Sequence, residues 1–103
     1  GFTSHLPHFL IFSLIETFIS QKNKKEMMKY FGTGFLDTTR IGKSNPEMWT
    51  DVFFSNKEVL IYWIFEFEKA LKKMKNLLEK NRVSEFLKEL KEIKKIRENI
   101  ENA

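Results

Sequence analysis

Residues 57–78 read KEVLIYWIFEFEKALKKMKNLL, and this stretch decides the fold because its large apolar side chains recur at helical spacing. The steps between them are four, three, four, three and four residues, at Leu60, Ile64, Phe67, Leu71, Met74 and Leu78. Residues 59–65 alone are bulky and β-branched enough to pass for a strand. A heptad pattern sustained over several turns is typical of an amphipathic helix, so it predicts a long helix over 57–78.

The flanking residues predict two further helices. On the C-terminal side, Asn81–Arg82 should break the long helix and Ser84 should cap a last amphipathic one. On the N-terminal side, Asn45 and Pro46 are typical of a helix start, because Asn caps backbone N–H groups and Pro suits the first helical position. That helix should run to about Ser55. With no strand pattern or repeat elsewhere, the sequence predicts an all-α helical bundle.

The first predicted helix, over residues 6–19, has almost no polar face. Thr3 or Ser4 can cap it, with Pro7 tolerated in the first turn. A helix that is apolar all round is normally surrounded by other helices. Since a chain of 103 residues is hardly long enough to surround it alone, we expect a homodimer with this helix and the 57–78 helix in the interface.

Between the apolar helices lies the stretch GTGFLDTTRI, residues 32–41, which holds a single arginine, Arg40. Its glycines allow positive φ and close backbone approach, and a guanidinium binds a carboxylate with two parallel hydrogen bonds. The stretch can therefore bind an anion, with Asp37 capping a short helix behind the glycine turn. The alternative is an ordinary loop with a solvated arginine, and the loop taken alone favours that alternative.

Composition excludes several classes of function. The net charge of +4 is mild and mixed in sign, unlike the one-signed patch of a nucleic-acid binder. No apolar run is long enough to cross a membrane, and there is no cysteine, so we expect a cytoplasmic protein of one domain, residues 1–103. His5 and His8 share a side of the first helix but have too few neighbouring ligands for zinc, so no metal is expected.

Four ordered motifs together resemble the C-terminal helical domain of the prephenate dehydrogenase family. In chain order they are Ser4–His5–Leu6–Pro7–His8, Gly34–Phe35 with Asp37 and Thr39–Arg40–Ile41, Pro46–Glu47–Met48–Trp49 with Asp51, and Ser55–Asn56–Lys57–Glu58. The resemblance covers about residues 4–80. It implies an intertwined homodimer with a fold like that of the C-terminal domain of 6-phosphogluconate dehydrogenase. No Gly-x-Gly-x-x-Gly motif follows a strand, so the chain looks like an excised domain that lacks the nucleotide-binding part.

The resemblance also implies roles for individual residues. Enzymes of this family oxidatively decarboxylate prephenate to 4-hydroxyphenylpyruvate in tyrosine biosynthesis, passing hydride to NAD or NADP. Arg40 would hold a substrate carboxylate, and Asp37 would orient or neutralise it. His8 would line the pocket, with His5 one turn away, and Trp49 would reach the site from the partner subunit. The remaining implied contacts come from Gly32 and Thr33. The family commonly has glycine at the position of Thr33, and the hydroxyl of Thr33 can donate a hydrogen bond there.

The general base of the family belongs to the nucleotide domain, so the resemblance implies no catalytic residue, no bound cofactor and no activity in this chain alone. Prephenate, and tyrosine as a feedback ligand, would bind at a site shared with the missing domain. The alternative is a stand-alone helical interaction module without an enzymatic role, in which Arg40 and His8 have no reason to face a common cleft. A basic nucleic-acid binder is a third hypothesis that the mixed-sign surface argues against.

Overall fold

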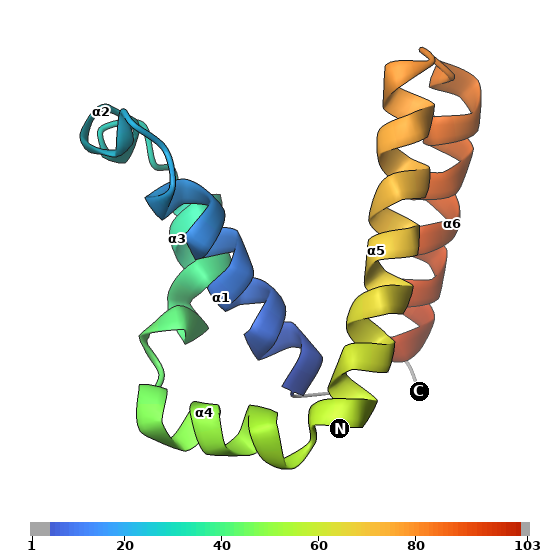
Figure 1. Ribbon diagram of the computed structural model, residues 1–103. Helices are drawn as coiled ribbons and strands as arrows, with labels where there is room; N and C mark the ends of the chain where they lie inside the picture. Colours follow the sequence, from blue (N-terminus) through green and yellow to red (C-terminus); the bar gives the residue numbers. More distant parts are fainter. Residues whose placement is uncertain (1–4, 102–103) are drawn as a thin grey trace. The chain divides into compact units, whose positions relative to one another are not determined.

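The structure is a computed structural model that describes residues 5–101. Within this range every regular element is a helix (Figure 1). The elements are α1 (His5–Ile19), α2 (Lys24–Met28), α3 (Thr33–Thr39), the 3₁₀ helix η1 (Arg40–Lys43), α4 (Pro46–Ser55), α5 (Lys57–Glu79) and α6 (Val83–Glu101). The prediction of an all-α fold is confirmed. None of the helices in the described range is long and apolar enough to cross a membrane.

Several helix ends follow from local chemistry. The side chain of Asn45 accepts a hydrogen bond from Met48 N at 2.9 Å and so caps α4, with Pro46 as its first residue, as predicted. The predicted caps of α1, Thr3 and Ser4, lie outside the described residues.

Two predicted caps are wrong. Asp37 lies inside α3, which already begins at Thr33, and Ser84 is the second residue of α6. In α3, Thr38 and Thr39 donate their hydroxyls to the carbonyls four residues earlier, at 2.7 and 2.8 Å. These bonds satisfy the hydroxyls without leaving the helix, so a threonine-rich stretch that reads as a turn remains helical.

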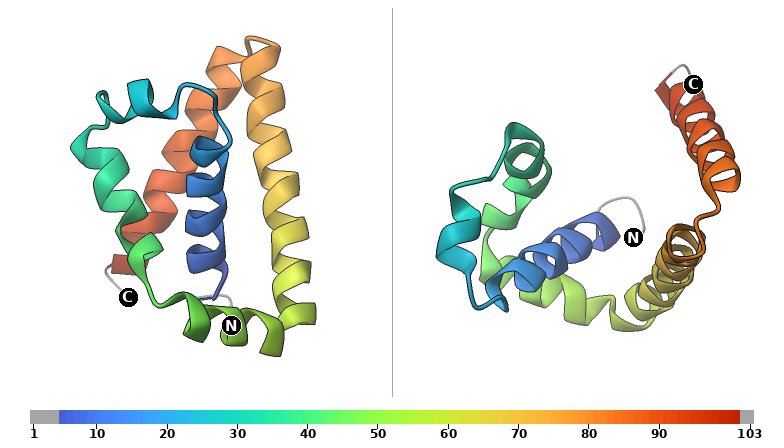
Figure 2. Two further views of the ribbon diagram at one scale, coloured as in Figure 1. Left: turned by 60° about the vertical axis from the view of Figure 1, so that its left-hand side comes forward. Right: turned by 90° about the horizontal axis from the view of Figure 1, so that it is seen from above.

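The described residues group into two compact units, one ending at Ile64 and one beginning at Phe65, so that the division falls within α5. In the first unit, α1 packs against α3, η1 and α4. Figures 1 and 2 show α3 running alongside α1 while α4 crosses near the beginning of α1. Since Leu14 is 42% exposed, these contacts do not surround α1, and its predicted central position stays a prediction that a partner subunit would have to complete. That the whole of 1–103 forms one domain stays a prediction.

Aromatic rings supply much of the packing in the first unit. Near the end of α1, Phe18 contacts Phe31 with ring centroids 4.8 Å apart, and Phe31 stacks on Phe35 at 4.3 Å. The contacts between these rings stabilise the packing of α3 on α1, because an aromatic pair contributes more stabilisation than its buried area alone would give. Yet only Leu6, Thr39 and Leu60 are buried in the described part of the chain, and Ile19 is 49% exposed.

In the second unit, α5 and α6 are joined by a tight turn at Asn81, whose φ of 55° is left-handed. Arg82 N donates to Leu77 O at 2.9 Å and Asn81 N donates to Leu78 O at 3.2 Å, the pair of bonds that defines a Schellman motif. The predicted break is thus confirmed. Beyond the turn α6 diverges from α5 (Figure 2), and Lys73 Nζ lies 3.2 Å from Glu89 Oε2 between the two helices.

Candidate functional site

The first unit brings three of the sequence-predicted site residues together. The imidazole of His8 stacks on the indole of Trp49, with centroids 3.9 Å apart and planes inclined by 17°. His5 meets the same indole edge to face at 6.3 Å. His8 and Trp49 are half-buried, so this group combines a polar ring with a partly desolvated surface. Such a surface suits a planar organic ligand with polar substituents.

The contact of Trp49 with these histidines lies within one chain. The resemblance implied that Trp49 serves the site of a partner subunit, and it did not indicate a stack on its own His8. No local sequence signal could have found this contact, because His8 and Trp49 are far apart in the sequence and meet only when α4 crosses α1. Action of Trp49 across a dimer stays a prediction.

Arg40 lies where α3 ends and η1 begins, and its side chain is exposed. Its backbone N–H donates to Asp37 O, which continues the helical turn. Among residues 5–101 no hydrogen bond or ion pair holds its guanidinium. The expected ion pair with Asp37 is thus not formed within the described chain. All five N–H donors of the guanidinium remain available to an external anion.

The glycine turn differs from the expectation. Gly32 has φ −90° and ψ 175°, an extended conformation open to any residue, and the described glycines all have negative φ. Gly34 lies inside α3, and Thr33 is the first residue of that helix. The prediction that these glycines adopt positive φ in a loop around an anion is therefore wrong. The reason is the packing of Phe31 and Phe35 on α1, which draws the stretch into a helix.

The element that carries Arg40 is fixed to α1 by close packing at Gly42. A Cβ at Gly42 would meet Ile15 Cδ1, with Ile11 Cγ2 at 3.7 Å. Arg40 on η1 and Trp49 on α4 are therefore both carried by elements packed on α1, the helix that contains His5 and His8. In the described residues, no three or more His, Asp or Glu side chains gather as metal ligands.

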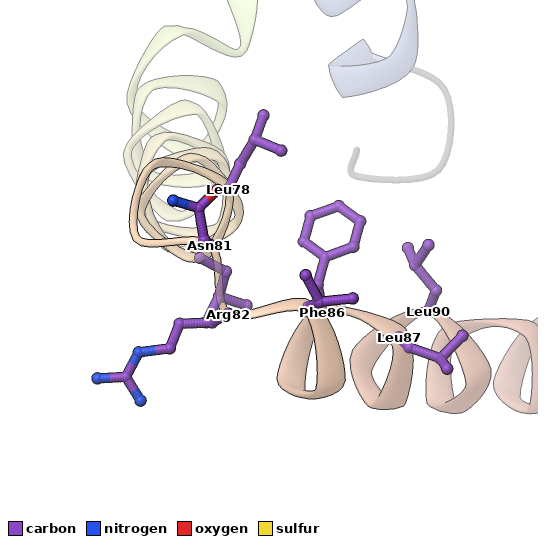
Figure 3. A pocket seen from close by; sticks show the side chains of 8 residues that line it. Leu78, Asn81, Arg82, Phe86, Leu87 and Leu90 are labelled. Carbon is purple, nitrogen blue, oxygen red and sulfur yellow. The ribbon is translucent and has the colours of Figure 1, made fainter.

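A hollow of about 300 Å³ lies at the turn of the second unit, away from any predicted site residue. It is lined by Leu77, Leu78, Asn81, Arg82, Val83, Phe86, Leu87 and Leu90. Figure 3 shows Phe86 and Leu90 extending from the same side of α6, while the Arg82 side chain points away from Leu78. Arg82 is instead paired with Glu85 at 2.8 Å. The side chains that line the hollow are thus mainly apolar.

Comparison with known proteins identifies the family. The sequence profile described as "Prephenate dehydrogenase, dimerization domain" matches residues 1–102. The chain belongs to this family. It is 31% identical over 97 residues to cyclohexadienyl dehydrogenase of Zymomonas mobilis, covering 92% of this chain and 33% of that protein. It is 29% identical over 98 residues to prephenate dehydrogenase of Bacillus subtilis, covering 94% of this chain and 26% of that protein.

Solved structures agree with the sequence relatives. The prephenate dehydrogenase of A. aeolicus, crystallised in complex with hydroxyphenyl propionate and NAD⁺, is 43% identical with a TM-score of 0.86. The match covers 94% of this chain and 34% of that one. Arogenate dehydrogenase of Synechocystis is 25% identical, also with a TM-score of 0.86, over 95% of this chain and 36% of that one. This chain thus spans about a third of the length of each of these structures.

Proposed function

We propose that this chain is the dimerisation and substrate-binding part of a prephenate dehydrogenase, and that it works joined to a nucleotide-binding part. The enzyme would oxidise and decarboxylate prephenate to 4-hydroxyphenylpyruvate: the ring loses CO₂ and a hydride, and NAD or NADP accepts the hydride. The family assignment and the names of the relatives support this reaction. Feedback binding of tyrosine at the same site stays a prediction.

The uncommitted guanidinium of Arg40 is the observation that carries the proposal. It is exposed at a helix junction and free of any ion pair with the described residues, and the backbone of η1, which carries it, packs on α1 at Gly42. Prephenate is a dianion, and a planar fork suits a carboxylate. His8 and Trp49 would supply a polar contact and a flat apolar surface for the rest of the substrate.

The chemistry of hydride acceptance would come from outside this chain. Dinucleotides bind at the carboxyl ends of parallel strands, where a glycine-rich turn opens a helix. Every regular element among the described residues is a helix, so these residues do not fit NAD or NADP by that design. We therefore assign binding and orientation of the substrate to this chain, and no catalytic residue.

A homodimer is the second part of the proposal. The family name specifies dimerization. The second unit also leaves large apolar side chains uncovered, among them Leu78, which is 69% exposed. Contiguous apolar surface on a soluble chain normally marks an interface. We infer that a second copy of this chain covers it.

Substitution of Arg40 tests the substrate site. In a protein that joins this chain to its nucleotide-binding part, Arg40→Ala should raise the KM for prephenate, because a charged pair is lost. The rise should correspond to a loss of roughly 2–4 kcal/mol of binding free energy. Arg40→Lys should recover only part, since a point charge cannot form the fork. The KM for the cofactor should hardly change. Steady-state kinetics measures both constants.

Lys43→Ala is the matched control, because Lys43 is an exposed cation on the same turn, η1. It should leave the prephenate KM within about twofold, as is usual for exposed side chains without a partner. If Arg40 is only a solvated loop residue, Arg40→Ala should have the same small effect on the prephenate KM. Unchanged prephenate KM and kcat in Arg40→Ala would therefore refute the assignment and favour the interaction module.

A further inference from the structure

Phe53 lies at the centre of the aromatic contacts between α1 and α4. Its ring meets Phe9 edge to face at 5.4 Å and 79°, and Phe12 at 6.0 Å and 84°. It also contacts Trp49, one turn earlier on α4, at 5.5 Å with planes tilted by 41°. Residues four apart lie on the same face of a helix, so Phe53 and Trp49 reach α1 together. Three simultaneous ring contacts fix the orientation of Phe53.

The same indole that Phe53 supports is stacked on His8. A contiguous series of rings therefore runs from Phe9 and Phe12 through Phe53 and Trp49 to the imidazole. A near-parallel stack at 3.9 Å requires the indole to stay within a narrow range of rotation. Because Phe53 occupies space beside the indole, its loss would let Trp49 turn, and His8 would lose its stacking partner. Binding groups act best when neighbours lock their rotamers.

We propose that Phe53 is a positioning residue of the substrate site, acting through Trp49 to hold the imidazole of His8 in its binding orientation. Phe53 itself is assigned no contact with substrate. The inference rests on the proposed function, because it takes His8 and Trp49 to be substrate contacts. The geometric part, that Phe53 maintains the His8–Trp49 stack, can be tested without any substrate.

NMR spectroscopy of the 103-residue chain tests the geometric part. A ring held over an indole face is shielded by the indole's ring current, so the His8 carbon-bound protons should resonate upfield of those of a free imidazole. Phe53→Leu should move these resonances downfield, because the indole is no longer held in place. Phe53→Tyr keeps the aromatic ring and should leave them nearly unchanged. Unmoved His8 resonances in a folded Phe53→Leu chain would overturn the proposal.

Kinetics of the joined, active protein tests the functional part. Phe53→Leu should raise the prephenate KM by roughly two- to tenfold, the range expected for the loss of one aromatic contact. The kcat and the cofactor KM should stay within about twofold, and Phe53→Tyr should restore the prephenate KM. A general loss of folded protein would instead lower the apparent kcat and leave both KM values unchanged.

Phe18→Leu is the matched control for both measurements. Phe18 is a half-buried phenylalanine of α1 that contacts Phe31 and Phe35 at the other end of the helix, remote from His8. It should leave the His8 resonances and the prephenate KM unchanged. Equal effects of Phe18→Leu and Phe53→Leu would overturn the positioning role. A raised prephenate KM in Arg40→Ala but not in Phe53→Leu would overturn the role of Phe53 alone. Unchanged KM in both variants would overturn the proposed function.

Discussion

At the scale of single residues, two glycines of the first unit have opposite surroundings. Gly42 lies where η1 packs against α1, and a Cβ there would meet Ile15 Cδ1. Gly34 lies in α3 with nothing within 4 Å of an added Cβ. Both have negative φ, so neither is needed for its backbone conformation. Close approach of two helices explains the first glycine, and nothing in the structure explains the second.

This contrast predicts stability changes of opposite sign. Gly42→Ala should lower the free energy of unfolding by about 1 kcal/mol, because Ile15 must leave its packed position. Gly34→Ala should raise it by about 0.5 kcal/mol, because alanine costs less conformational entropy in a helix. Urea denaturation of both variants at one protein concentration measures the difference. Stabilisation by both substitutions would contradict this expectation and show that Ile15 Cδ1, the end of a flexible side chain, turns aside at little cost.

Contacts between distant residues were the part of the site that the sequence could not predict. The resemblance supplied His8 and Trp49 as members of a site, but their stacking depends on how α4 crosses α1. Phe53 was missed because a half-buried phenylalanine on a helix is ordinarily a core residue. Its spacing of four from Trp49 was the one available signal, and that signal has meaning only once the stack is known.

At the scale of elements, the turn at Asn81 determines how α6 leaves α5. Its left-handed φ closes the two hydrogen bonds of the Schellman motif, and asparagine tolerates that conformation better than other residues with a Cβ. The sequence predicted this break because Asn is typical there. It predicted the start of α4 from a different local feature, the side chain of Asn45, which accepts a hydrogen bond from Met48 N.

The free energy of unfolding of variants at position 81 should therefore depend on how much strain the new residue has at positive φ. Asn81→Val should lower the free energy of unfolding by roughly 1–2 kcal/mol, because a β-branched residue is strained in the left-handed region. Asn81→Gly should leave it unchanged or slightly higher, since glycine adopts this conformation without strain. Thermal unfolding followed by circular dichroism compares the two. A Val variant as stable as the Gly variant would mean that the turn has another conformation.

Elements determined by packing were harder to predict than those with local caps. The start of α3 was placed at Asp37 because Asp is a good cap, whereas the helix begins at Thr33. The spacing of four between Phe31 and Phe35 was the missed signal, since both rings pack on Phe18. Tertiary packing decided this boundary, and a cap rule cannot detect it.

At the scale of the whole molecule, the second unit is notable because α5 and α6 leave much of their apolar surface uncovered by each other. The predicted heptad face of α5 has one buried residue, Leu60, while Leu71 is 57% exposed and Leu78 69% exposed. On α6 the apolar positions Leu90, Ile93, Ile96 and Ile100 are all exposed as well. An amphipathic pattern is maintained only where something covers the apolar face. The proposed dimer would account for both the regularity of the pattern and its exposure in one chain.

Charged substitutions on this face test the dimer. The double variant Leu71→Asp, Leu78→Asp places two carboxylates one heptad apart on the exposed stripe of α5. In a monomer these changes should cost little, within about 0.5 kcal/mol each, because both side chains already face water. In a dimer with an obligate interface above about 2,000 Å², they would bury unpaired charge and dissociate the subunits.

Sedimentation velocity at micromolar concentration distinguishes the two cases. We expect the native chain to sediment as a dimer and the double Leu→Asp variant as a monomer, or as a partly unfolded chain. The matched control is Lys72→Ala with Asn76→Asp, which changes the net charge equally at exposed polar positions of the same helix. It should stay dimeric, because it leaves the apolar stripe intact. A native chain that sediments as a well-folded monomer would contradict the dimer, and a dimer that survives both carboxylates would exclude this face of α5 from the interface.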